Sequence, residues 1–249
     1  MIFLKNTLNY TGVTVYGDKM DLEELYAALH TIVGDVDELI SYEGARLRVL
    51  GVCYDIRHAL MGHRAIEFVD NGLDADKMRF LSVATTDKNI YYTFNVLWPE
   101  LLFITMALND FVSLYAKKQV KNSYNPIQDY RNIWDSTIAQ VRGFQAAIAK
   151  CIKETIPETS VSRIMKLMTS DYTYYNYYAT QYLDELNCHF IDMNKEKRLK
   201  NITIMAKRIA EQGKEYQEVK EAVIGAARKY NCSMTEIRSL VEYPEDFEW

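Results

Sequence analysis

The chain has 249 residues, of which 49% are apolar and 25% charged, and its formal net charge is −5. This composition is close to the globular average and excludes disordered and fibrous proteins. The acidic balance makes nucleic acid the less favoured partner without excluding it. Residues 1–8 do not form a secretory signal, and the apolar run 101–108 is too short to cross a membrane, so we expect a cytoplasmic protein with no membrane contact.

The first elements predicted from the chain are a hairpin and a helix. Alternating β-formers at 13–16 follow a turn-like run, so they predict a strand that pairs with residues 2–4. Asp21 and Glu24 form a capping-box pattern that predicts the start of a helix, and Gly34 predicts its end. The apolar stripe of this helix consists of Leu22, Leu25, Leu29 and Ile32.

A second helix is predicted over residues 44–61, with Gly62 as its stop. Its expected buried face consists of Leu47, Leu50, Tyr54 and Met61. Gly51 lies inside this helix, where glycine lowers stability, so we expect a neighbouring element to approach it closely.

Three strands are then predicted at residues 65–70, 78–84 and 90–96, and the last has the clearest alternation. Pro99 favours the first turn of a buried helix over residues 99–118. These signals predict an α+β fold in which a small antiparallel sheet of about four or five strands, with helices, is followed by an all-helical half.

A polar run at 117–126 coincides with the change from mixed to purely helical signals, so we place a boundary between lobes 1–118 and 126–249, which can still form one continuous domain. Beyond it, apolar periodicity and caps predict six helices, at residues 127–154, 160–168, 171–193, 195–212, 215–230 and 233–242. The acidic segment 243–249 is expected to be loose until something holds Phe247 or Trp249.

The densest polar cluster lies where the second helix meets the following strand, and it consists of Asp55, Arg57, His58, His63, Arg64 and Glu67. Arg57 and His63 match the R-x(4–6)-H spacing of HEPN ribonucleases, in which such a pair handles the 2′-hydroxyl and phosphate of RNA. Chance alone gives about 0.6 such matches in a chain of this composition, and the strands around it depart from the all-helical HEPN fold. An ion-paired helix end with surface histidines is therefore the favoured interpretation.

No motif indicates a cofactor or a metal. Asp70, Asp74 and Asp76 lack the ligand spacing of a calcium loop and are better explained as a solvated turn. The glycine-rich nucleotide loops, the G-x-S-x-G elbow and the H-E-x-x-H zinc motif are all absent from the sequence. We therefore expect neither a cofactor nor a metal site.

The most unusual local feature is a tyrosine cluster, formed by Tyr172, Tyr174, Tyr175, Tyr177, Tyr178 and Tyr182. On a helix these rings cannot all share one face, so some are expected to meet solvent or a partner. Tyrosine is enriched at protein interfaces because its rigid ring buries a large area while its hydroxyl stays hydrogen-bonded. The alternative is that the rings pack against the β-containing lobe.

Two blocks carry a resemblance to a known family, LRVLGVCYDIRHALMG at 47–62 and NIYYTFNVLWPELLFITMALNDF at 89–111. They resemble an uncharacterised family of bacterial and phage proteins, and the similarity covers the first half of the chain. The resemblance implies a cytoplasmic setting and a role in bacterial or phage biology such as defence or counter-defence.

Two functional hypotheses remain. The leading one is a non-catalytic protein that uses the tyrosine-rich surface to oligomerise or to bind a protein partner. The alternative is a nuclease or other phosphate-processing enzyme centred on Arg57, His58, His63 and Glu67.

Overall fold

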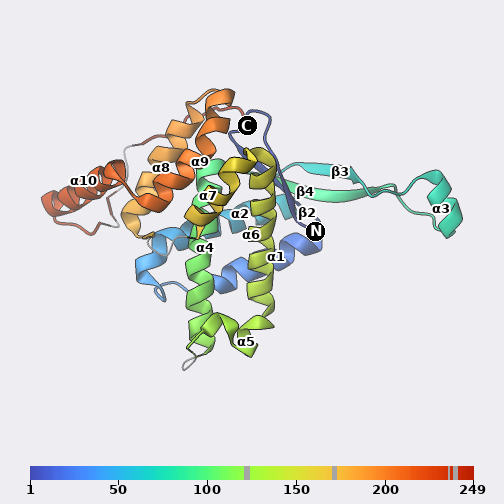
Figure 1. The fold of residues 1–249 in the computed structure, drawn as a ribbon, viewed down its shortest axis with the longest axis horizontal. Coiled ribbons are helices and arrows are strands. Elements are labelled where there is room, and N and C mark those ends of the chain that lie inside the picture. The colour runs from blue at the N-terminus through green and yellow to red at the C-terminus, as the bar shows by residue number, and fades with distance from the viewer. Residues whose placement is uncertain (121–123, 170–172, 235, 238–240) are drawn as a thin grey trace.

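The structure is a computed structural model that describes residues 1–120, 124–169, 173–234, 236–237 and 241–249, together with the backbone but not the side chain of Tyr177. It confirms the α+β class (Figure 1). The strands are β1 Phe3–Asn6, β2 Gly12–Gly17, β3 Ile66–Asp70 and β4 Lys88–Leu97. The α-helices are α1 Lys19–Ile32, α2 Glu43–Leu60, α3 Ala75–Leu81, α4 Trp98–Gln119, α5 Tyr130–Ile133, α6 Ser136–Thr155, α7 Glu158–Met168, α8 Tyr177–Ile191, α9 Lys195–Glu211 and α10 Lys214–Tyr230.

The four strands form one antiparallel sheet in the order β1-β2-β4-β3. The predicted pairing of the first two strands is confirmed, with Phe3 opposite Tyr16. Val13 lies opposite Val96 and Val15 opposite Phe94, and these four buried side chains share the face that packs on the core. The sheet therefore has one apolar face inside the molecule.

The first helix begins earlier than predicted. Asp18 is its N-cap and forms a capping box with Asp21, so the prediction of a start at Asp21 with Glu24 was wrong by one turn. Asp18 is the cap because β2 ends at Gly17, directly before it. The extended backbone of Asp18 lets its carboxylate accept a hydrogen bond from the Asp21 amide. The predicted stripe of Leu22, Leu25, Leu29 and Ile32 is buried, as expected.

The second helix has the predicted bounds within one residue, but its predicted buried face was wrong. Leu47, Tyr54 and Met61 are each more than half exposed. The buried face carries smaller side chains instead, namely Ala45, Val49, Val52, Cys53, Ile56 and Ala59. Small residues let α2 approach its neighbours α1, α4 and α8 closely. Gly51 has no atom within 4 Å of the position of an added Cβ, so the expected close approach is also absent.

The strand predicted at 78–84 was wrong, because this segment contains the short helix α3. Asp74 caps it by accepting the amide of Lys77 at 2.8 Å, and Ser82 ends it in the left-handed region at φ 53°. A local capping interaction outweighs the weak alternation of Arg79, Phe80 and Leu81.

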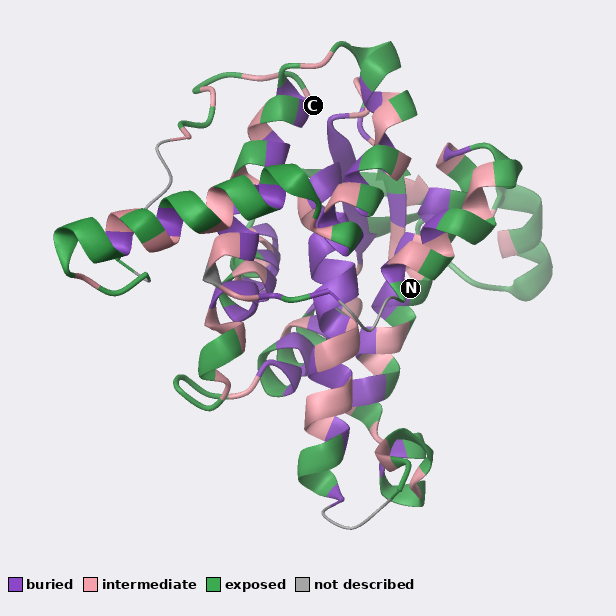
Figure 2. Ribbon diagram, turned by 60° about the vertical axis from the view of Figure 1, so that its left-hand side comes forward, coloured by how far each residue is buried: buried purple, intermediate pink, exposed green. Residues whose placement is uncertain are grey.

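Strands β3 and β4 extend beyond the body of the protein and carry α3 at their far end (Figure 1). We call residues 61–92 the arm. No residue of the arm is buried, and Figure 2 shows it as an exposed projection beside a buried centre.

Helix α4 lies at the centre of the body, where it packs against α2, α6, α8 and α9. One cluster of buried apolar residues contains members from both sides of the predicted boundary, including Trp98, Phe144 and Phe190. Among the described residues, no helix is both long and apolar enough to cross a membrane.

Three helices predicted in the second half differ from the structure. The helix predicted at 171–193 begins only at Tyr177, because the described residues before it, 173–176, are not helical. The segment predicted as one helix at 127–154 is interrupted, because Asp129 and Asp135 each cap a new helix, α5 and α6. In the segment predicted as a helix at 233–242, the Ser233 main-chain amide donates to the Glu236 carboxylate at 3.0 Å, but the described residues there are not helical. Residues 235 and 238–240 lie outside the described part of the chain.

Candidate functional site

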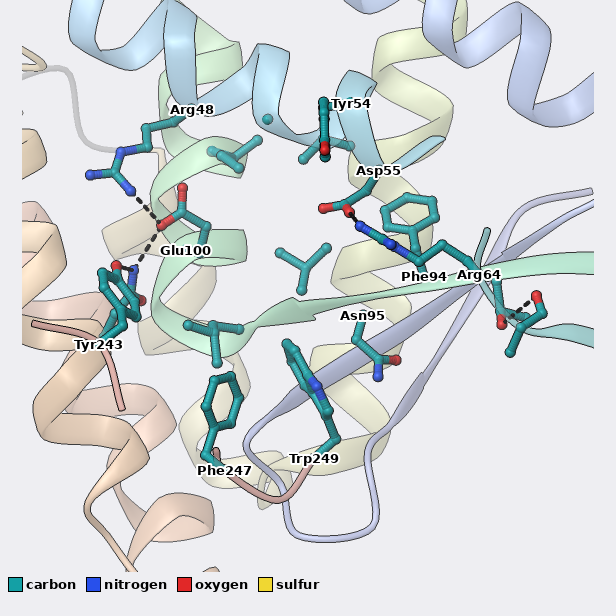
Figure 3. A pocket seen from close by; sticks show the side chains of 18 residues that line it. Arg48, Tyr54, Asp55, Arg64, Phe94, Asn95, Glu100, Tyr243, Phe247 and Trp249 are labelled. Carbon is teal, nitrogen blue, oxygen red and sulfur yellow. Dashed lines mark hydrogen bonds and ion pairs between the residues drawn. The ribbon is translucent and has the colours of Figure 1, made fainter. Parts of the chain in front are cut away.

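A cavity of about 670 Å³ lies between α2, the end of β4, the start of α4 and the segment 243–249 (Figure 3). We call it the β4 cavity. Its volume is within the range of about 300–1,000 Å³ that is usual for ligand sites. Segments that lie far apart in the sequence therefore meet around one cavity.

One end of the β4 cavity is a charged network. Arg48 lies 2.7 Å from the Asp184 carboxylate and 3.4 Å from that of Glu100. Asn187 donates to Glu100 at 2.8 Å, and the Tyr243 hydroxyl donates to Asp184 at 2.6 Å. One guanidinium therefore faces two carboxylates, and the network carries a net charge of −1 when both are ionised.

Burial changes the acidity of this network. Removal from water raises the pKa of Glu100 above its ordinary value, although the charge of Arg48 opposes that change. Burial also raises the pKa of Tyr243, and the adjacent Asp184 carboxylate raises it further. The buried Asn187 Oδ1 has no hydrogen-bond partner among the described residues. The network therefore contains a buried acceptor that no described residue satisfies.

The opposite wall is formed by α2 and by the residues just before β3. Asp55 pairs with Arg64 at 2.8 Å, so these two charges cancel. Gly51 presents no side chain to the cavity. Tyr54 borders the same wall and is half exposed.

The segment 243–249 forms the remaining wall and is held by the β1–β2 turn. The Asn9 amide donates to the Trp249 carbonyl at 3.1 Å, and the Thr11 hydroxyl donates to the Glu248 carbonyl at 2.6 Å. These bonds place Phe247 and Trp249 on the cavity, with ring centroids 5.1 Å apart. The sequence predicted that this segment stays loose unless something binds it, and within the chain the β1–β2 turn does so.

The predicted catalytic residues lie outside the β4 cavity. His58 and His63 have ring centroids 5.7 Å apart at the end of α2, and the Arg57 guanidinium lies over the Tyr54 ring. Glu67 instead accepts a hydrogen bond from Tyr16 at 3.2 Å. The structure brings Arg57, His58 and His63 to one helix end, while the Glu67 carboxylate is hydrogen-bonded on the sheet.

The tyrosine cluster is largely internal where it is described. Tyr175 and Tyr182 are buried, Tyr178 is partly buried and only Tyr174 is exposed, at 68%. Tyr178 and Tyr182 both pack edge-on against Tyr216 of α10. Tyr172 and the side chain of Tyr177 lie outside the described part of the structure.

Sequence reasoning identified Asp55 and Arg64 but missed Arg48, Glu100, Asp184 and Asn187. One signal was present, because Glu100 is the only charged residue in the run 98–108. A single carboxylate at the start of an apolar helix points to a specific partner. That partner, Arg48, is 52 residues away in sequence.

Comparison with known proteins identifies a family for this chain. A family model described as a domain of unknown function (DUF6904) matches residues 2–249. No curated protein and no solved structure matches the chain. Because the model covers almost every residue, the chain belongs to the DUF6904 family.

Proposed function

We propose that this chain is a non-catalytic binding protein that forms a dimer through its arm. One observation carries the proposal, which is that the core face of the sheet continues, uncovered, into the arm. In the body this face is made by Phe94 and Val96. Farther out, the same face carries the opposed pairs Tyr92–Ile66 and Ile90–Phe68.

These outer side chains are exposed to an unusual degree for their type. Phe68 is 66% exposed and Ile90 50%, and at the end of the arm Phe80 is 87% exposed. A two-stranded hairpin alone is marginally stable in water. A contiguous exposed apolar surface typically marks a protein interface. Covering the arm would therefore both stabilise it and remove this surface from water.

The charges of the arm favour a second copy as the cover. Residues 61–92 contain five acidic and four basic side chains, so two arms do not repel each other strongly. Within α3, Asp74 and Asp76 lie at the start, whereas Arg79 lies near the end. A two-fold axis would pair the acidic start of one helix with the basic end of the other.

Light scattering coupled to size exclusion tests this proposal. The expected mass of the parent protein is about twice 29.0 kDa. Phe68→Glu with Phe80→Glu should give the monomer, because it places charge in the interface. Trp134→Glu is the matched control, since Trp134 is 84% exposed but lies off the arm, and it should leave the dimer intact. A parent protein that is monomeric at all concentrations contradicts the proposal.

The tyrosine-rich segment remains a second candidate surface, with Tyr174 as its exposed ring. Substitution Tyr174→Ala should leave the mass unchanged if the arm is the interface. The cytoplasmic setting and the role in bacterial or phage biology belong to this proposal and rest on composition and resemblance.

The phosphate-processing alternative is supported by one observation, the proximity of His58 and His63 beside Arg57. It predicts cleavage of RNA or DNA that the Arg57→Ala, His63→Ala double variant abolishes. Equal cleavage by the parent and the double variant would exclude this site.

A further inference from the structure

We propose that the β4 cavity binds an extended peptide segment of a protein partner, which adds as a strand to the open edge of β4 at residues 93–97. Arg64 and Ala65 of the arm border this cavity, but Phe68 and Phe80 do not, so dimerisation through the arm and peptide binding can fail independently. It rests on the main-chain edge, on the open space at Gly51 and on the charge at the α4 end.

The main chain of β4 alternates between its two neighbours. The Trp98 amide donates toward β2, to the Thr11 carbonyl, so the even-numbered residues face β2. The Thr93 amide donates to the Ala65 carbonyl on the opposite side. The odd-numbered residues therefore face β3, which pairs with β4 only as far as Tyr92.

Beyond that point the odd-numbered positions face the β4 cavity. Asn95 presents its amide and carbonyl there, and Leu97 presents its amide, because no strand in the described part of the chain pairs with either residue on that side. Main-chain polar groups at a sheet edge are a ready template for another strand. A peptide antiparallel to β4 would continue the line of β3, and this is the geometry of strand addition in peptide-binding domains.

Gly51 supplies the room for such a peptide. It lies within α2 and lines the cavity, and an added Cβ would meet no atom within 4 Å. Glycine inside a helix lowers stability relative to alanine. In this place the missing side chain widens the cavity across from the strand edge. Five residues of strand span about 16 Å, which sets the length of the bound segment.

The charges select the side chains of the peptide. At the α4 end, Arg48 is outnumbered by the carboxylates of Glu100 and Asp184, and Glu100 lines the cavity. A lysine or arginine of the peptide would pair with the Glu100 carboxylate. Phe247 and Trp249 border the other side, so apolar or aromatic side chains suit the positions that face them. The occupant is therefore an extended segment with apolar residues and one basic residue.

Selection from a phage-displayed library of random octapeptides tests the proposal. Clones are selected on the parent protein after depletion on Gly51→Phe, in which a ring fills the cavity. Gly143→Phe is the matched control, because Gly143 is also an exposed glycine inside a helix with open space around it. Expected clones bind the parent and Gly143→Phe equally, lose at least about tenfold in affinity for Gly51→Phe, and share a basic residue.

Backbone methylation then tests the strand geometry. Each amide of a selected peptide is methylated in turn, and binding is measured by fluorescence anisotropy. Methylation at alternate positions should weaken binding about tenfold, since a buried main-chain acceptor loses its donor, while intervening positions change it little. In the Glu100→Gln variant the preference for the basic residue should be lost. Circular dichroism of each variant confirms folding.

Four results would overturn the proposal. They are the absence of any enriched clone, equal binding to Gly51→Phe, a methylation profile without two-residue alternation, and a dimer that Gly51→Phe dissociates, which would assign the cavity to a second copy. The arm variant Phe68→Glu with Phe80→Glu should bind the selected peptides as the parent does, so failure of dimerisation and failure of peptide binding are distinguishable.

Discussion

Replacing Gly51 by alanine should stabilise the protein. Gly51 is exposed in the interior of α2, and nothing lies within 4 Å of the added Cβ, so the methyl group causes no clash. Alanine is favoured over glycine inside a helix by about 0.8–1.0 kcal/mol. Because the surroundings neither resist nor bury the methyl group, we expect that whole difference in the free energy of unfolding.

The other glycines provide an internal scale for this prediction. Gly143 and Gly225 also lie in helices with open space around the added Cβ, so their alanine variants should gain the same amount. Gly44 should behave in the opposite way, because its Cβ would lie 2.9 Å from the Thr180 side chain. The sign is therefore set by the space around each position.

Urea unfolding followed by circular dichroism measures these differences, and thermal unfolding should show a rise of about 2–4 °C for Gly51→Ala. An unchanged or lower stability for Gly51→Ala, beside a gain for Gly143→Ala, would refute the reasoning. It would mean that the backbone of α2 at this point requires glycine.

Three further predictions concern buried polar groups and the arm. Arg198→Ala should lower the free energy of unfolding by about 3 kcal/mol, because the guanidinium donates to Thr11 and to three main-chain carbonyls. Urea titration measures this loss, and Lys197→Ala is the control at an exposed position. The pKa of Glu100 is raised in the folded state, so on a rise in pH its carboxyl ionises first in the unfolded state. The free energy of unfolding should therefore fall as the pH rises from about 4.5 through the raised pKa. Glu100→Gln should remove this pH dependence, and identical pH profiles for the variant and the parent would contradict the prediction. Asp74→Ala should destabilise α3 locally, because the helix loses its N-cap, and this should be seen as faster amide exchange in residues 75–81 with no change in global unfolding.

The parts of the fold that sequence predicted are those fixed by local signals. Alternation identified β4, and Pro99 with its apolar surroundings identified α4. Errors arose where two local signals competed, as in residues 78–84, where the cap at Asp74 decides for a helix. Periodicity in α2 gave its bounds but not its buried face, because small residues rather than large ones make its contacts.

The candidate site was largely beyond such reasoning. Arg48 and Asp184 are 136 residues apart in sequence, and no spacing rule joins them. The open edge of β4 depends on where β3 stops, which is a property of pairing rather than of either strand alone. The burial of the tyrosine cluster also depends on tertiary packing, because α10 packs against α8.

The hydrogen bonds between the β1–β2 turn and segment 243–249 affect the order in which the nascent chain completes the cavity. Thr11 and Glu248 are separated by 237 residues, so the ribosome makes this wall of the cavity long after the hairpin. At roughly 5–20 residues per second, the hairpin waits on the order of ten seconds or more for that wall. A nascent chain can thus have a folded hairpin while its peptide groove is still unfinished, and any partner that needs the complete groove would engage only after segment 243–249 has been translated.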